Sequence, residues 1–83
     1  MDREILKCVK MRDAAFISAV MNDDFRPFMK YASRYSIPVP DSERILKGSV
    51  YKAAYNVVTL PPEVRKIAKR KCLDLGITPE FMT

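Results

Sequence analysis

Hydrophobic residues recur along this 83-residue chain at the spacing of α-helices, and no segment alternates as a β-strand would. A first apolar stripe predicts one amphipathic helix from Asp2, its N-cap, to about Asn22. The stripe consists of Ile5, Val9, Phe16 and Val20. Arg12 also falls within it, and Asp13 is itself a good N-cap. A break near residues 11–13 is therefore an alternative to a single helix.

A second helix is predicted to begin near Pro27, because its fixed φ suits a first helical position. This helix should end by Ser36, since the two prolines of IPVP (37–40) force extended backbone on the residues before them. Its apolar face comprises Phe28, Tyr31, Ala32 and Tyr35.

The third helix is predicted to follow Asp41 or Ser42, either of which is a sound N-cap. We favour one continuous helix, although Gly48 leaves open a division into two pieces. Its core face is expected to be Leu46, Val50, Ala53 and Val57. Tyr51 and Tyr55 fall roughly on the opposite side.

The fourth helix is predicted to start at Pro62 and to stop at Gly76, a natural left-handed terminator after which Ile77 folds back. Its inward face is expected to be Val64, Ile67, Ala68, Cys72 and Leu75. The segment TPEF (78–81) repeats the signals of a helix start and predicts one short turn, from which Phe81 and Met82 dock onto the core.

These elements predict an all-α fold in which residues 1–83 form a single domain, a compact bundle of four main helices plus a short C-terminal helical turn. No apolar run approaches the roughly 18 residues of a membrane span. The N-terminus carries acids where a signal peptide needs cations, so we expect a cytoplasmic protein without a membrane partner.

The residue types present exclude most catalytic chemistry. The chain has no histidine and only two glycines, so it lacks an imidazole base and a glycine-rich phosphate loop. Asp23 and Asp24 are explained by helix capping. Cys8 and Cys72 are expected to be buried reduced thiols, with a bridge between them as the alternative. We therefore expect no enzyme, no cofactor, no metal site and no small-molecule substrate.

Positive charge is unevenly distributed along the chain, whose formal net charge is +5. Residues 1–24 carry four cations and five acids, residues 25–58 carry six and two, and residues 59–83 carry five and three. The excess therefore belongs to the last three helices, where the tyrosines also occur. Cations beside rings that can stack are typical of nucleic-acid binding.

The segment VRKIAKRKCLDLG (64–76) holds the densest run of cations. Helical geometry directs four of them away from the inward face, and these are the predicted primary contacts: Arg65, Lys66, Lys69 and Arg70. Lys71 instead falls between Val64 and Ile67 and should snorkel past the core edge. A cationic stripe on the second helix extends the predicted site with Arg26, Lys30 and Arg34.

Two alternatives compete with DNA or RNA as the partner of these cations. An adaptor or inhibitor could recognise an acidic protein surface through them, with Leu73, Tyr51 and Tyr55 as anchors. The cations could also be only the solvated side of ordinary helices.

The segments EILKCVKMRDAAFISAV and DFRPFMKYASRYSIPVPDSERIL resemble the helical N-terminal domain of replicative DNA helicases. The likeness covers about residues 3–46 and consists of an early Ile-Leu, an Asp before a Phe, and a tyrosine-to-proline segment before a capped helix. These are general signals of helix ends, so the resemblance implies a helical fold and no particular site residue.

Overall fold

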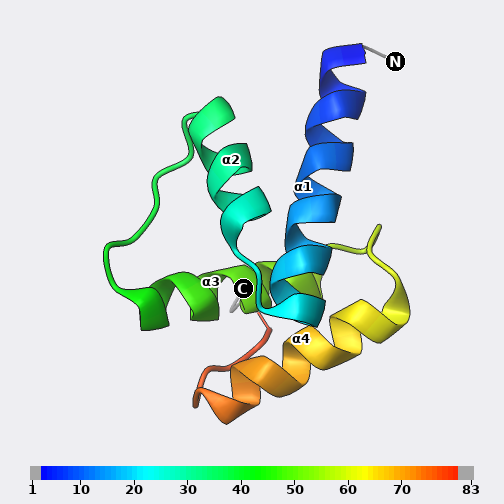
Figure 1. Cartoon of the computed structure of the whole chain (residues 1–83). Coiled ribbons are helices and arrows are strands. Elements are labelled where there is room, and N and C mark those ends of the chain that lie inside the picture. Colours follow the sequence, from blue (N-terminus) through cyan, green and yellow to red (C-terminus); the bar gives the residue numbers. More distant parts are fainter. Residues whose placement is uncertain (1–2, 81–83) are drawn as a thin grey trace.

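The computed structural model describes residues 3–80 and confirms the all-α fold. It contains four helices in this range, α1 (Arg3–Asn22), α2 (Arg26–Arg34), α3 (Glu43–Asn56) and α4 (Pro62–Asp74). The long α1 packs against the other three, α2 packs on α1 alone, and α3 has its most extensive packing with α4. In Figure 1, α2 runs antiparallel beside α1, while α3 and α4 lie below them at the C-terminal end of α1.

The core is formed where the second half of α1 meets the other helices. Its fully or nearly fully buried side chains include Phe16 and Val20 of α1, Phe28 of α2, Val50 of α3 and Cys72 of α4. Ile5 was predicted to share the stripe of α1, but it is 56% exposed. The first turns of α1 extend beyond the helices packed against its second half, so nothing covers Ile5 there.

Helix α1 is continuous, and the predicted alternative of a break near residues 11–13 is wrong. The Arg12 side chain turns along the helix, where Nε donates to Asp13 Oδ1 at 3.1 Å and Nη2 donates to Thr59 at 3.4 Å. Asp13 also accepts the Thr59 hydroxyl at 3.0 Å. Both polar side chains therefore bind the α3–α4 connection instead of capping a second helix.

Helix α3 is also continuous, as predicted, with Ser42 as its N-cap. Its buried face differs from the prediction, because Gly48, Tyr51 and Ala54 are buried with Val50, while Leu46, Ala53 and Val57 are only partly buried. The placement of Tyr51 on an outer side was wrong. Helix α3 is covered on more than one side, by α1 and by α4, so one apolar stripe does not describe its burial.

Helix α4 begins at Pro62 and buries Val64, Ala68 and Cys72, as predicted. Gly76 follows it with φ of 74°, and the Ile77 amide donates back to the Cys72 carbonyl at 2.9 Å. Residues 79–80 form a bend, and Phe81 and Met82, on which the predicted C-terminal turn depends, lie outside the described residues.

Both cysteines are free thiols. Cys72 is fully buried, and this burial raises the pKa of its thiol. Among the helices of residues 3–80, none combines the length and the apolar character that a membrane span requires.

Candidate nucleic-acid interface

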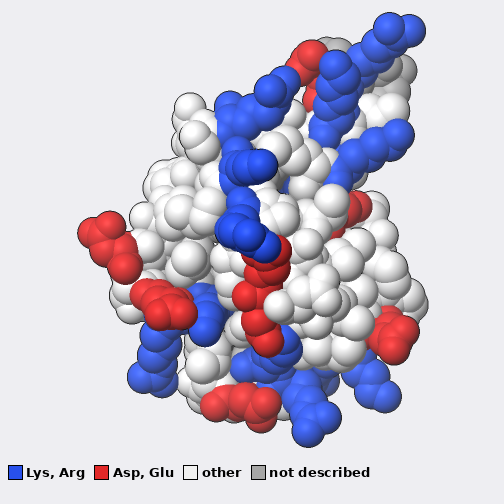
Figure 2. All heavy atoms as spheres, viewed as in Figure 1, with Lys and Arg blue, Asp and Glu red and all other residues white. Residues whose placement is uncertain are grey.

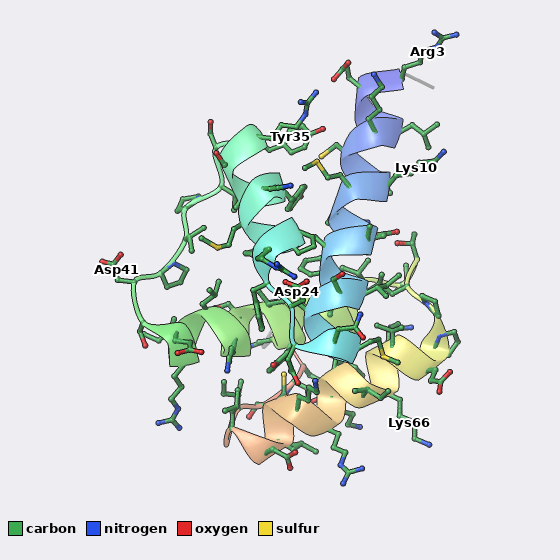
Figure 3. The ribbon with its side chains drawn as sticks, viewed as in Figure 1. Arg3, Lys10, Asp24, Tyr35, Asp41 and Lys66 are labelled. Carbon is green, nitrogen blue, oxygen red and sulfur yellow. The ribbon has the colours of Figure 1, made fainter. Side chains whose placement is uncertain are left out.

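Helix α4 presents Lys66, Lys69 and Arg70 to solvent, as predicted. Figure 3 shows Lys66 extending from the lower edge of the molecule, away from the other helices. Within residues 3–80, neither Lys66 nor Arg70 forms an ion pair or a side-chain hydrogen bond. These two are the cations of α4 that remain available to a partner.

Arg65, predicted to be a contact residue, is engaged inside the fold. Its Nε donates to the Tyr55 carbonyl at 2.8 Å, and its guanidinium lies 5.7 Å from the centre of the Tyr55 ring. Tyr55 belongs to the last turn of α3, where carbonyls lack partners within the helix. Arg65 therefore fastens α4 to the end of α3 and is only partly exposed.

Lys69 is partly engaged as well. Its Nζ lies 5.6 Å from the centre of the Tyr55 ring and 3.9 Å from Glu80 Oε1. An ion pair this long and this exposed contributes little to stability. Lys69 can therefore exchange Glu80 for a phosphate at small cost.

Acids flank the run of cations in α4. Glu63 and Asp74 stand at the two ends of the helix, both exposed, and Glu80 lies against Lys69. In Figure 2, the blue side chains along the lower edge are accordingly interspersed with red ones. The positive potential of this helix is weaker than its run of five cations suggests.

Lys71 is buried more deeply than Lys66, Lys69 and Arg70, as its position in the helix predicted. Its Nζ donates to the Val20 carbonyl and to Asp23 Oδ1, the latter at 2.8 Å, and lies 5.4 Å from the centre of the Tyr51 ring. The Lys71 ammonium lowers the pKa of Asp23. Burial, reinforced by the hydrogen bond to Asp23, raises the pKa of Tyr51 to about 12. Lys71 is a structural residue.

The predicted extension on α2 is separated from α4. Helix α2 makes no direct packing contact with α4, and Figure 2 shows a red column between the α2 cations and those below. Figure 3 labels one member of this column, Asp24. Asp24 binds Arg26 through both carboxylate oxygens at 2.9 Å, which lowers its pKa to about 2. Arg26 is therefore neutralised, whereas Lys30 and Arg34 remain exposed.

A second cationic group, which the sequence reasoning missed, lies beside Lys30 and Arg34. The first half of α1 contributes Arg3, Lys7 and Lys10, all exposed. In Figure 2, blue side chains gather over the upper half of the molecule, where Figure 1 shows α1 and α2. We call Arg3, Lys7, Lys10, Lys30 and Arg34 the α1–α2 surface.

Few acids counter the α1–α2 surface. Glu4 is the only acid in residues 3–12, and residues 26–34 contain no acid. Arg3, Lys7, Lys10 and Lys30 form no ion pair within the described residues, and Arg34 only approaches the Tyr35 ring, at 5.9 Å. This surface carries the least compensated positive charge in the described part of the chain.

A finer division of the sequence reveals this group. Residues 1–24 have a net charge of −1, but the four cations of this segment all precede Asp13, and three of its five acids are Asp13 and the residues after it. Because α1 is one long helix, this separation in sequence is a separation in space. The net charge of residues 1–24 as a whole therefore hid the cationic group in the first half of α1.

An apolar recess of about 310 Å³ lies between α2, the segment 37–40 and α3. Phe28, Tyr31, Ile37 and Leu46 line it, and no charged side chain does. It therefore extends neither group of cations. Residues 3–80 also contain no cluster of three or more acidic or cysteine side chains that could hold a metal ion.

Comparisons with protein-family models, curated proteins and solved structures found no match to this chain. The resemblance of residues 3–46 to the helicase N-terminal domain stays a prediction.

Proposed function

We propose that this chain is a small, non-enzymatic binding module that contacts the phosphate backbone of nucleic acid through the α1–α2 surface. Lys66, Lys69 and Arg70 of α4 are a second, weaker set of contacts. The observation that carries the proposal is the gathering of five exposed cations in residues 3–12 and 26–34, two segments in which Glu4 is the only acid. Such cations bind phosphates by releasing the condensed counterions of the nucleic acid.

An acidic protein surface is the less favoured partner. Protein interfaces depend on aromatic or large apolar anchors at their centre. Of the three anchors predicted for such a partner, Tyr51 is only 5% exposed and Tyr55 is covered by Arg65 and Lys69. Leu73 is exposed, but it stands without an aromatic neighbour on α4. Phosphate contacts need no such anchor.

The proposal is tested by measuring fluorescence anisotropy of labelled nucleic acid at several salt concentrations, with two sets of substitutions. The first set removes the α1–α2 surface: Arg3→Gln, Lys7→Gln, Lys10→Gln, Lys30→Gln and Arg34→Gln. The second set removes the three α4 contacts: Lys66→Gln, Lys69→Gln and Arg70→Gln. Affinity losses are compared for each charge removed. All these side chains are exposed, so the helical circular dichroism should not change.

We expect the first set to weaken binding by more than about tenfold and to reduce the salt slope by about 4.5, since each of the five lost phosphate contacts reduces it by about 0.9. The second set should have the smaller effect. Absence of wild-type binding, or equal affinity of both variants and the wild type, would contradict the proposed function. A larger loss of affinity from the second set would identify the α4 cations as the main contacts.

A further inference from the structure

We infer that the nucleic acid bound at the α1–α2 surface is double-stranded and is held by its two backbones without base stacking. This inference rests on the proposed function and names the class of nucleic acid that the same surface fits. Two independent observations carry it, the burial of the aromatic rings and the arrangement of the cations.

Every aromatic ring within residues 3–80 is already packed. Phe16, Phe28, Tyr31 and Tyr51 are buried, and Phe25 lies against Tyr51 with ring centres 6.0 Å apart. Tyr35 lies between Tyr31 and the Arg34 guanidinium, and Tyr55 lies beneath Arg65 and Lys69.

Proteins that bind single strands gain much of their affinity from bases stacked on exposed rings, typically about 1–3 kcal/mol for each base. The described surface offers no such ring. A single strand could therefore be held here by its phosphates alone, which is the weaker mode for a flexible ligand that must also be ordered.

The cations form two rows on neighbouring helices. On α2, Lys30 and Arg34 are four residues apart and therefore about 6 Å apart along the axis. On α1, Arg3, Lys7 and Lys10 span about 10 Å along its axis. The α2 row has two cations and the α1 row has three, so each row can contact two or three consecutive phosphates of one strand.

The two rows lie on different flanks of the α1–α2 pair. Axes of packed helices are about 8–10 Å apart, and Figure 3 shows Lys10 pointing away from α2, on the far flank of α1. The rows are therefore separated by more than the distance between the axes, on the scale of the roughly 12 Å major groove. A duplex presents two backbones at this separation, and a single extended strand presents one.

The surface also lacks the amide side chains that usually read adenine. The chain contains no glutamine, and its two asparagines lie outside the rows: Asn56 donates to the Lys52 and Pro79 carbonyls, and Asn22 ends α1. Amide side chains are the usual readers of adenine. Rows of cations without amides beside them favour contacts with the phosphate backbone, so we expect the binding to depend little on base sequence.

The inference is tested by titrating the full chain with a short labelled duplex, with each of its separated strands, and with a duplex of scrambled sequence. We expect the duplex to bind about tenfold more tightly than either strand, and the two duplexes to differ by less than about twofold. Equal or tighter binding of a single strand would overturn the inference and leave the proposed function intact. No binding of any of these ligands would refute both.

Half-surface variants separate the two rows. Lys30→Gln with Arg34→Gln removes the α2 row, and Arg3→Gln with Lys10→Gln removes the same number of charges from the α1 row, two of its three cations. If each row contacts its own strand, either pair should remove most of the preference for duplex and affect single-strand binding less. A duplex preference that survives in both variants would show that the rows do not contact two backbones. The double substitution Lys66→Gln with Arg70→Gln removes the same amount of charge from the weaker α4 contacts. It should lower the affinity for duplex and for single strand alike, and so preserve the ratio between them.

Discussion

Lys71, Arg65 and Arg44 each donate to a carbonyl at the C-terminal end of a helix other than their own. Lys71 reaches Val20 in α1, Arg65 reaches Tyr55 in α3, and Arg44 reaches Leu75 at the end of α4. Such carbonyls have no partner within their helix and carry the negative end of its dipole. These three cations therefore stabilise contacts between helices, and fewer cations remain available for binding.

At the same scale, Asp24 predicts how stability depends on pH. Its pKa is about 2 in the folded protein, because Arg26 donates to it from the side chain and the backbone, against an ordinary value of about 3.9. Between these values the unfolded chain binds a proton that the folded chain does not. The stabilisation is therefore present above about pH 4 and is lost as the pH falls toward 2.

Asp24→Asn should flatten this dependence, which can be measured from urea unfolding midpoints at a series of pH values from neutral to about 2. Asp41→Asn is the control, since Asp41 is exposed in the α2–α3 connection and makes no side-chain contact within the described residues. If the stability of the Asp24 variant fell equally steeply at low pH, the ion pair between Asp24 and Arg26 would not be the cause of the acid sensitivity.

At the scale of the element, the helix ends follow from local chemistry. Ser42 accepts the Ile45 amide at the start of α3, Pro62 opens α4, and Gly76 ends it in the left-handed conformation. The continuity of α1 and α3 was harder to predict from the sequence. Arg12 and Gly48 suggested breaks, but both residues lie within continuous helices. The boundary residues act over a few neighbours, whereas the continuity of α1 and α3 depends on partners elsewhere in the bundle.

Gly76 gives a prediction about one such boundary. No atom lies within 4 Å of the position that a Cβ would occupy, so a substitution there tests the backbone conformation alone. Gly76→Ala should lower the free energy of unfolding by about 1 kcal/mol, because a φ of 74° is unfavourable for alanine. Gly76→Asn should cost less, since asparagine tolerates this region. Urea unfolding of both variants measures the difference, and equal losses would contradict the explanation.

At the scale of the whole molecule, α1 separates charge. Its first half projects past the core and carries cations, and its second half is packed within the bundle and is followed by Asp23 and Asp24. The α1–α2 surface and the α4 cations are thus held at different ends of the molecule, with these acids between them. A single continuous basic face, as the sequence suggested, does not form.

Lys71 provides a test of how the bundle is held together, because it joins α4 to the end of α1 and, through Asp23, to Tyr51 of α3. Lys71→Met should lower the free energy of unfolding by about 2 kcal/mol, the cost of losing charged hydrogen bonds in a partly buried site. Lys66→Met, on the same helix but exposed, should change it by less than about 0.5 kcal/mol. Chemical denaturation compares the two, and similar losses would show that Lys71 is not a tie between helices.

The sequence by itself determined the four helices, most of their ends and most of the buried positions, because periodicity, prolines, N-caps and Gly76 act over a few neighbouring residues. The tertiary structure alone decided which cations are free. Lys71 and Asp23 are 48 residues apart, and Arg44 and Leu75 are 31 apart. The cations of α1 and those of α2 become neighbours only when the two helices pack. Charges are compensated by neighbours in space, and in a helical bundle most of those neighbours come from other helices.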